Sequence, residues 1–135
     1  MTLLASLEAI GFIATPYKTL AECPRNIDPQ GPLCNLVIRK DLRDGLLGLH
    51  VGQKILILYW FEQVDRSILR QHSRRTSELA GIFALRTPNR RNPIGAAILP
   101  IEQIDDGVIS VRGLDCLDGT PLIDIKPAMA EECTC

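Results

Sequence analysis

Short apolar runs closed by turn signals recur along the chain. Leu33 to Arg39 alternates apolar and polar positions, and Lys54 to Phe61 is a continuous apolar run of strand length. The second run is rich in branched and aromatic residues, so we expect a central strand that is buried on both faces. Leu7 to Ala14 is rich in β-formers and ends at Thr15-Pro16, where proline removes a backbone donor. This segment predicts a further strand that ends in a turn.

The second half of the chain repeats this pattern with shorter runs. Asp105-Asp106-Gly107 is a turn signal and predicts a hairpin between the runs on either side of it. Seven short strands separated by Gly, Pro and Asp, with no long helix, predict a mainly β fold, a small antiparallel β-barrel with short helical excursions. The strands expected in this half are Gly81–Leu85, Gly95–Ile104, Gly107–Leu114 and Pro121–Ile125.

Two segments interrupt the series of strands. Leu42, Leu46 and Leu49 recur at helical spacing, but glycines lie between them, so at most a short helix fits there. Glu62 to Ala80 is polar and rich in arginine. We expect this second segment to form a long excursion from the barrel.

Length and composition favour one domain. A chain of 135 residues with 46% hydrophobic composition supports one core, which we assign to residues 1–127, with 128–135 as a cysteine-containing tail. No apolar run approaches the roughly 20 residues of a membrane span, and no basic region precedes an apolar stretch at Met1 to Ser6. These features predict a cytoplasmic protein with no membrane partner.

The five cysteines do not have the spacing of a zinc ribbon, and their odd number argues against a secreted disulfide framework. Cys34 and Cys116 lie in apolar surroundings and are expected to be core thiols. Cys133 and Cys135 follow two glutamates, so the pair is either a soft-metal or redox site or the end of an unstructured tail. We therefore assign no metal site.

Charge is unevenly distributed although the net charge is only −1. From Asp65 to Arg91 there are seven arginines and two acids, whereas from Pro100 onward there are eight acids and two basic residues. A basic segment in a near-neutral domain suggests a surface that faces a polyanion. A solvated, arginine-rich loop explains the same charges.

Two polar stretches contain residues suited to chemistry. Arg86 to Gly95 has three arginines and two asparagines between prolines that stiffen the loop, which suits phosphate, carboxylate or base edges. In the second stretch, Leu114 to Pro127, Asp124 and Lys126 are two residues apart and point to the same face of an extended strand. That acid and base are either a structural ion pair or part of a pocket.

Several motifs in register resemble the TrmO-like (YaeB/TsaA-like) tRNA adenosine N6-methyltransferase family over about residues 10 to 127. They are Ile10 to Tyr17, Pro24-Arg25-Asn26, Leu58 to Phe61, Gly81 to Arg86, Arg90 to Gly95, Asp118 to Pro121 and Asp124 to Pro127. The resemblance implies a β-barrel methyltransferase outside the Rossmann class, and the sequence has no Gly-x-Gly-x-x-Gly fingerprint. It further implies S-adenosylmethionine as cofactor, a homodimer with the cofactor near the subunit interface, and methylation of N6 of threonylcarbamoyladenosine beside the anticodon of tRNA.

The resemblance also implies a set of site residues, with the catalytic base unassigned. The cofactor pocket is expected to draw on Pro24, Arg25, Asn26, Phe61, Glu62, Arg86, Ala96, Leu114, Asp115, Cys116 and Leu117. Substrate contacts are expected from Arg90, Asn92, Asp118 and Lys126. The chain departs from the family at Asn26, Glu62, Arg91 and Ala128, where Gln, His, Pro and Tyr are usual.

Methyl transfer from a sulfonium needs in-line positioning and a pocket that tolerates positive charge on sulfur. Asp115 or Glu62 is a carboxylate that supplies this, Phe61 offers a π face, and Asp118 or Asp124 is a possible base. The departures favour a second hypothesis, a non-catalytic S-adenosylmethionine-binding sensor. A methyltransferase of another small substrate is a third.

Overall fold

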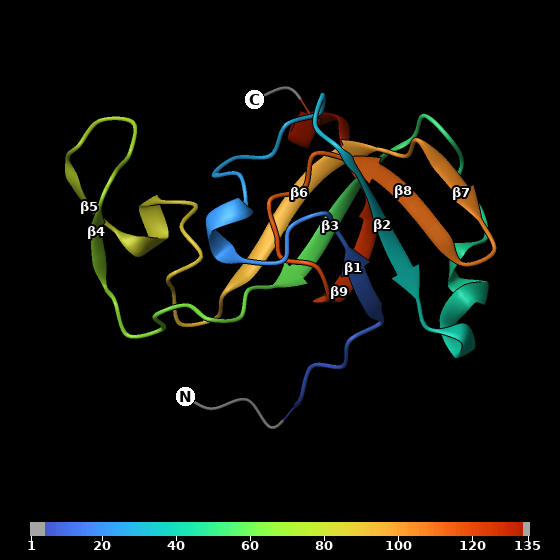
Figure 1. Cartoon of the computed structure of the whole chain (residues 1–135), viewed down its shortest axis with the longest axis horizontal. Helices are drawn as coiled ribbons and strands as arrows, with labels where there is room; N and C mark the ends of the chain where they lie inside the picture. Colours follow the sequence, from blue (N-terminus) through green and yellow to red (C-terminus); the bar gives the residue numbers. More distant parts are fainter. Residues whose placement is uncertain (1–4, 134–135) are drawn as a thin grey trace.

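Residues 5–133 of the computed structural model fold around one large antiparallel sheet (Figure 1). Seven strands join in it in the order β6-β3-β9-β1-β2-β8-β7. They are β1 (Gly11–Ala14), β2 (Leu33–Ile38), β3 (Lys54–Trp60), β6 (Ile94–Pro100), β7 (Gln103–Asp105), β8 (Val108–Arg112) and β9 (Thr120–Pro127). The mainly β, antiparallel class expected from the sequence is confirmed, although β1 begins later than the expected start at Leu7.

The sheet is strongly curved because of one short connection. β6 and β7 lie at the two ends of the strand order, yet only Ile101 and Glu102 separate them in the chain. The Ile101 amide donates to the Gln53 carbonyl, whereas the Glu102 amide donates to that of Ser110, so the chain changes partner strand between these residues. The expected strand Gly95–Ile104 is therefore two strands.

This connection brings β6 against β8, but the two share no ladder within the described sheet. The curved sheet therefore forms a partly closed barrel that remains open between β6 and β8. The hairpin expected at Asp105-Asp106-Gly107 is confirmed, with Asp105 opposite Val108. Asp106 and Gly107 both have positive φ, 47° and 78°, as a tight turn between twisted strands requires.

The core lies inside the curve of the sheet. Ile55, Ile57 and Tyr59 of β3 are at most 1% exposed, whereas the alternating Leu56, Leu58 and Trp60 are half-buried. The expectation that this run is buried on both faces is thus wrong for the single chain, which covers only the inner face. The remaining core side chains come mainly from β1, β2, β6, β8 and β9, and they include the thiols of Cys34 and Cys116, as expected.

A second, two-stranded sheet stands apart from the main sheet in Figure 1. It consists of β4 (Arg70–His72) and β5 (Leu79–Gly81), and the 3-10 helix η3 (Ile82–Ala84) follows it. We call residues 69–84 the arm. The arm confirms the expected excursion, but the strand expected at Gly81–Leu85 is wrong. The chain curls there because the Ile82 amide donates to the Leu69 carbonyl and the Leu85 amide to that of Ile82.

The other helices are single 3-10 segments. They are η1 (Leu20–Glu22), η2 (Lys40–Leu46) and η4 (Ala130–Cys133), and η2 is the short helix expected near Leu42. Across residues 5–133, no helix has the length and apolar character needed to cross a membrane.

Gly95 provides a test of the packing between β3 and β6. A Cβ there would lie 2.5 Å from Cε2 of Tyr59 and 2.7 Å from Cε2 of Phe61, whereas a Cβ at Gly45 would meet nothing within 4 Å. We predict that Gly95→Ala lowers the free energy of unfolding by about 1–3 kcal/mol, because the buried Tyr59 ring has no room to move. Gly45→Ala is the control and should be neutral or stabilising in the same urea titration. Equal stability of the two variants would contradict this packing.

Candidate cofactor and substrate site

Two loops that are distant in the sequence meet at one end of the sheet. The Asp28 amide donates to the Gly113 carbonyl at 2.9 Å, and the Gly113 amide donates to the Pro32 carbonyl at 2.9 Å. Gly113 has a φ of 83°, and a Cβ there would collide with the Asp28 carbonyl, so glycine is required. This junction places the loop that carries Pro24, Arg25 and Asn26 beside the segment Leu114 to Leu117.

Asp115 is a half-buried titratable residue at this end of the molecule. Its Oδ1 accepts a 2.7 Å hydrogen bond from the hydroxyl of Tyr59, which is only 1% exposed. Burial raises the pKa of the Asp115 carboxyl, and the Tyr59 hydrogen bond and the charge of Arg86 lower it in part. Burial and the neighbouring carboxylate also raise the pKa of the Tyr59 hydroxyl, so the tyrosine remains the donor.

An aromatic ring from the residue after β3 and a guanidinium from the loop before β6 lie near this pair. The Phe61 ring packs edge-on against Tyr59, with 5.2 Å between ring centroids. The Arg86 Nη2 donates to the Ala96 carbonyl at 2.9 Å, which holds Arg86 against β6. The structure therefore gathers Phe61, Arg86, Ala96 and Asp115 around Tyr59.

Side chains alternate along Leu114 to Leu117. Leu114 and Cys116 are at most 1% exposed and point into the core, whereas Asp115 and Leu117 are half-buried. Any contact of Leu114 or Cys116 with a cofactor would have to come from the backbone. Burial raises the pKa of the Cys116 thiol to about 12, which makes it an inert thiol.

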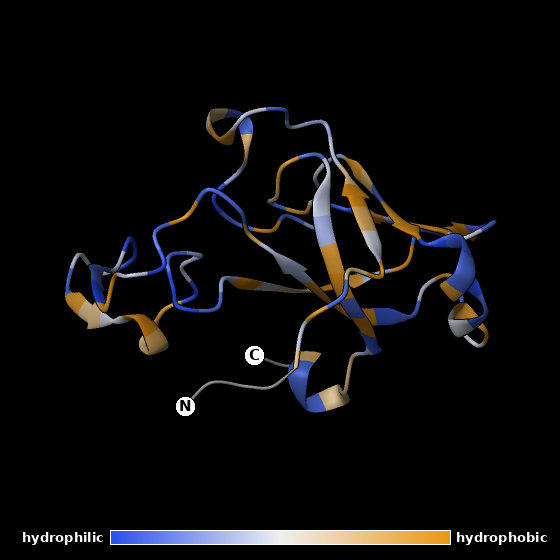
Figure 2. Ribbon diagram, turned by 90° about the horizontal axis from the view of Figure 1, so that it is seen from below, coloured by the Kyte–Doolittle hydropathy of each residue, from blue (hydrophilic) through white to orange (hydrophobic). Residues whose placement is uncertain are grey.

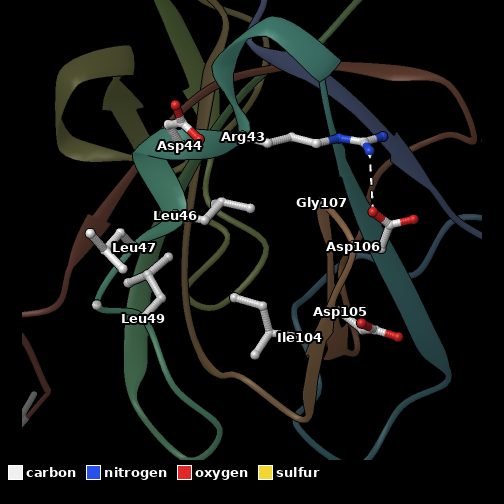
Figure 3. Close-up of a pocket in the computed structure, with 10 residues that line it drawn as sticks. Arg43, Asp44, Leu46, Leu47, Leu49, Ile104, Asp105, Asp106 and Gly107 are labelled. Carbon is white, nitrogen blue, oxygen red and sulfur yellow. Dashed lines mark ion pairs between the residues drawn. The ribbon is translucent and has the colours of Figure 1, made fainter.

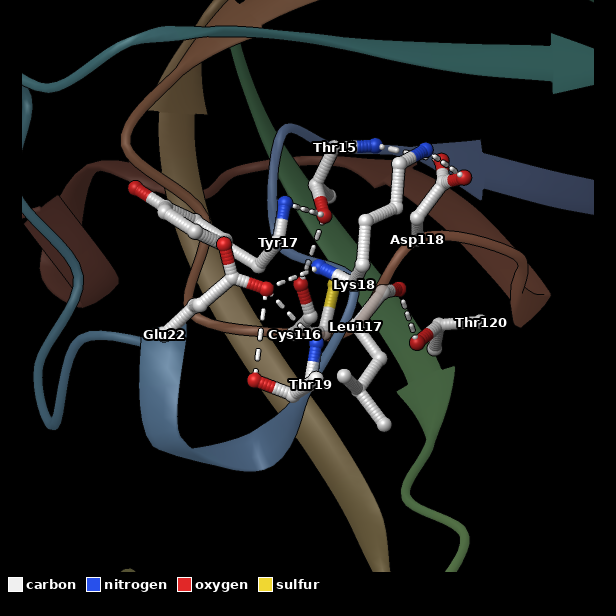
Figure 4. Close-up of polar contacts among 9 residues, drawn as sticks. All are labelled: Thr15, Tyr17, Lys18, Thr19, Glu22, Cys116, Leu117, Asp118 and Thr120. Carbon is white, nitrogen blue, oxygen red and sulfur yellow. Dashed lines mark hydrogen bonds and ion pairs between the residues drawn. The ribbon is translucent and has the colours of Figure 1, made fainter.

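A polar network fixes the position of the Cys116–Thr120 turn (Figure 4). The Thr15 hydroxyl donates to the Cys116 carbonyl at 2.9 Å, and the Thr120 hydroxyl to that of Leu117 at 2.6 Å. Asp118 accepts from the Thr15 amide at 3.0 Å and from the Lys18 ammonium at 2.6 Å. The Lys18 and Thr15 bonds lower the pKa of Asp118, so this carboxylate is a poor proton acceptor.

Other expected site residues lie apart from Asp115. The Lys126 ammonium pairs with the Asp124 carboxylate at 3.2 Å, which favours the structural ion pair over the pocket. Lys126 lies opposite Leu56 in the ladder, on the face of the sheet away from the Tyr59 side chain. Glu62 and Asn92 are exposed in the connections that follow β3 and precede β6.

Arg90 has a structural role that the sequence did not reveal. Its guanidinium donates to the carbonyls of Leu85 and Thr87, each at 3.0 Å, and to that of Ile82 at 3.4 Å. Three N–H groups of the guanidinium are thereby engaged, while no bond from its Nε–H is found among the described residues, so the expected contact of Arg90 with the substrate stays a prediction. Arg90 also ties η3 to the loop that follows it.

A separate groove of about 720 Å³ lies at η2 and the β7–β8 turn (Figure 3). Leu46, Leu49 and Ile104 line it, together with Arg43, which pairs with Asp106 at 3.5 Å. None of the expected site residues lines this groove.

No group of three or more potential metal ligands occurs among residues 5–133. Cys133 is half-buried at the end of η4. The Cys133-Thr-Cys135 pair extends to Cys135, which lies outside the described residues.

Sequence reasoning missed Tyr59, which it treated only as part of a buried strand. A tyrosine in a buried strand signals a need for a polar partner, since its hydroxyl is costly to bury unpaired. The partner, Asp115, lies 56 positions away in the sequence. Only the fold shows that the two meet.

The raised pKa of Asp115 can be tested by titration. We expect its carboxyl to titrate above the ordinary value of about 3.9, and Tyr59→Phe and Arg86→Ala each to raise that pKa further, because each removes an interaction that favours the carboxylate. Carbon-13 NMR titration, with Asp115→Asn to assign the signal, measures this.

The same shift affects stability. Because the pKa of Asp115 is raised in the folded state, its carboxyl contributes to the free energy of unfolding at pH values below its unfolded-state pKa. This contribution is lost as the pH rises through the folded-state pKa. Asp115→Asn should therefore flatten that part of the stability profile. An Asp115 that titrates at or below 3.9 would contradict the burial argument.

Comparison with known proteins connects this geometry to a family. Residues 12–132 match the family model of the tRNA-methyltransferase O N-terminal domain. A protein of Rhizobium radiobacter named "Probable S-adenosyl-L-methionine-binding protein VirR" is 44% identical over 123 residues, which cover 91% of this chain and 70% of that protein. The "tRNA (adenine(37)-N6)-methyltransferase" of Mus musculus is 31% identical over an alignment that covers 93% of this chain and 33% of the mouse protein.

Solved structures agree with the family match. A crystal structure of TrmO superimposes with a TM-score of 0.77 at 25% identity and covers 100% of this chain and 60% of that one. TrmO from Pseudomonas aeruginosa gives a TM-score of 0.75 at 25% identity, with 98% and 60% covered. The chain thus spans about 60% of the length of these TrmO chains. On the family match across residues 12–132, the chain belongs to the TrmO family.

Proposed function

We propose that this protein is an S-adenosylmethionine-dependent tRNA methyltransferase that acts on N6 of threonylcarbamoyladenosine. The observation that carries the proposal is the half-buried Asp115 carboxyl, held by Tyr59 and facing the charge of Arg86, at the junction of the two loops expected to bind the cofactor. Names of relatives support it, since one is a tRNA (adenine(37)-N6)-methyltransferase and another a probable S-adenosyl-L-methionine-binding protein.

The residues present fit the charges of the cofactor. S-adenosylmethionine brings an electrophilic methyl group on a sulfonium, together with an ammonium, a carboxylate and an adenine ring. Asp115 supplies a negative charge for the cationic end, Arg86 a cation for the carboxylate, and Phe61 an aromatic face for adenine or sulfonium. A bound cation would also favour the ionised form of Asp115 despite its burial.

The acceptor nitrogen must approach the methyl group in line with the bond that breaks, and must lose a proton. Asp118 and Asp124 each form an ion pair with a lysine ammonium, at N–O distances of 2.6 Å and 3.2 Å. The pKa of Asp118 is lowered by its bonds to Lys18 and Thr15, and the Asp124 carboxylate is occupied by Lys126, so we assign neither as the base. The loops at Gly113 and Cys116 hold the cofactor side of the site still while the acceptor enters.

A non-catalytic S-adenosylmethionine-binding sensor is the second candidate, and a methyltransferase of another small substrate is the third. The relative at 44% identity carries only a binding name, and this chain covers 70% of it against 33% of the mouse enzyme. Asn26 and Glu62, which depart from the family pattern, lie in the segments expected to bind the cofactor. These observations favour the sensor.

A homodimer in the cytoplasm belongs to the same proposal. Phe12, Pro121, Trp60 and Ile94 form a row across the outer face of β1, β9, β3 and β6, because Phe12 lies opposite Pro121 and Trp60 opposite Ile94. Phe12 is 46% and Ile94 38% exposed, and Trp60, Pro121 and Ile123 border a hollow of about 270 Å³. A second copy would cover this apolar face. We assign the protein to the cytoplasm because the proposed reaction needs access to tRNA.

The cofactor proposal predicts a loss of affinity at Arg86. Arg86→Ala should weaken S-adenosylmethionine binding by about 1.5–3 kcal/mol if the guanidinium makes a buried, charge-assisted bond to the cofactor carboxylate. Calorimetric titration measures this, with Arg112→Ala on β8 as the matched arginine control. If the wild-type protein gives neither heat nor thermal stabilisation at millimolar ligand, the cofactor assignment fails.

The acceptor proposal predicts a new nucleoside. Purified protein, S-adenosylmethionine and tRNA that carries threonylcarbamoyladenosine should yield its N6-methyl derivative in mass-spectrometric nucleoside analysis. Asp115→Asn should yield less, and tRNA from a deletion strain should lack the product. An unchanged nucleoside profile alongside normal cofactor binding would favour the sensor.

The dimer proposal predicts a mass change. Light scattering should give twice the 14.9 kDa chain mass for the wild type and the monomer mass for Trp60→Glu, because a carboxylate in an apolar interface is costly to bury. Leu47→Glu, at a side chain just after η2 that is 96% exposed, is the control and should leave the dimer intact. A monomeric wild type at micromolar concentration would rule the dimer out.

A further inference from the structure

The structure divides the arginine-rich segment into two groups. Near the main sheet, three guanidiniums are engaged: Arg66 donates to the Arg91 carbonyl at 2.7 Å, and Arg86 and Arg90 donate to carbonyls as described above. The Arg91 side chain is exposed and has no hydrogen bond or ion pair among residues 5–133. On the arm, the side chains of Arg70, Arg74 and Arg75 are exposed and make no hydrogen bond or ion pair with any of residues 5–133. Three of the four unengaged guanidiniums of the segment therefore lie on the arm, and the fourth is that of Arg91 in the 86–91 loop.

The tip of the arm is an ordered turn. The Ser73 amide donates to the Glu78 carbonyl at 2.8 Å, and the Ser77 amide donates to the Ser73 carbonyl at 2.8 Å. The Ser73 hydroxyl accepts from the amides of Arg75 and Thr76, and the His72 ring contacts the Ser77 carbonyl at 3.1 Å. Arg74 and Arg75 thus extend from a backbone that is already in place, which lowers the entropy cost of binding.

The arm also exposes large apolar side chains. Phe83 is 90% exposed, Leu69 is 73% and Leu79 is 52%. Figure 2 shows hydrophobic positions on the arm beside hydrophilic ones, at a distance from the hydrophobic strands of the main sheet. An aromatic ring with this exposure has a free face, and Phe83 lies in η3, at the end of the arm that leads into Arg86.

The loop that follows η3 anchors the arm. The Gln71 Oε1 accepts from the Thr87 hydroxyl at 3.1 Å and from the Asn89 amide group at 3.5 Å. Arg90, which belongs to the same loop as Thr87 and Asn89, donates a hydrogen bond to the Ile82 carbonyl. The arm is therefore fixed next to the loop that carries Arg86, beside the candidate cofactor site.

We propose that the arm is an RNA-binding element that takes unpaired nucleotides, with Arg70, Arg74 and Arg75 on phosphates and Phe83 stacked on a base. This inference rests on the proposed function in naming RNA as the substrate class. Its own support is the pairing of unneutralised guanidiniums with an exposed aromatic ring, the combination by which proteins bind single-stranded nucleic acid.

Charge favours RNA over a protein partner. Residues 69–84 contain three arginines and one acid, Glu78, so the surface complements a polyanion. A second copy of this chain that met the arm through its own arm would bring an equally cationic surface against it. The arm's position beside Arg86 also places a bound nucleotide near the methyl donor.

The test measures binding of a fluorescein-labelled anticodon stem-loop RNA and of a single-stranded oligoribonucleotide by fluorescence anisotropy across a salt series. Arg74→Ala with Arg75→Ala should weaken both and reduce the log-log salt slope by roughly 1.4 units. Phe83→Ala should weaken binding about tenfold with an unchanged slope, and Phe83→Trp should restore it. Lys40→Ala with Leu47→Ala, on η2 at the other end of the molecule, is the control and should change neither quantity.

Circular dichroism and S-adenosylhomocysteine titration of each variant confirm an intact fold and cofactor site. Arm variants that keep wild-type RNA affinity and salt slope would overturn the proposal. Arm variants that instead convert a dimer into a monomer would overturn it in favour of a protein interface. Arm-dependent RNA binding without methyl transfer would sustain this proposal while the proposed function failed.

Discussion

The hydrogen bond between Tyr59 and Asp115 is the interaction on which the site depends. Tyr59, a buried tyrosine near the C-terminal end of β3, needs a partner for its hydroxyl, and Asp115 provides it at 2.7 Å. The bond fixes the segment after β8 above the core. Gly113, two residues earlier, then fixes the loop that carries Asn26. One buried polar pair thus sets the positions of two loops that the sequence separates widely.

The curvature of the sheet makes this arrangement possible. Because two residues connect β6 to β7 at opposite edges, the sheet must bend until β6 meets β8. The bend brings the end of β6, with Ala96 and its bond to Arg86, toward the segment that follows β8. Asp115 follows β8 and Arg86 lies in the loop between η3 and β6, yet the charge of Arg86 in part lowers the raised pKa of the Asp115 carboxyl.

Much of the sheet could be predicted from the sequence because its signals are local. The alternation from Leu33 and the turn at Asp106-Gly107 each follow from neighbouring residues, and the structure contains both. The arm hairpin was missed because Arg70 to His72 has a weak strand pattern, and only pairing with Leu79 to Gly81 makes it a strand. The anchoring role of Arg90 was missed because sequence does not show that three backbone carbonyls face its guanidinium.

The same limits apply to the candidate site. Family-like motifs indicated Phe61, Arg86 and Asp115, and the fold gathers these three around Tyr59, whereas Lys126 lies on the other face of the sheet. The most direct test is amide shift mapping of nitrogen-15-labelled protein with S-adenosylhomocysteine. If the cofactor binds beside Asp115, the amides perturbed by S-adenosylhomocysteine will cluster at Pro24 to Asn26, Arg86 and Leu114 to Leu117. Perturbations that gather instead along the groove at Leu46 to Leu49 and Ile104 would contradict it.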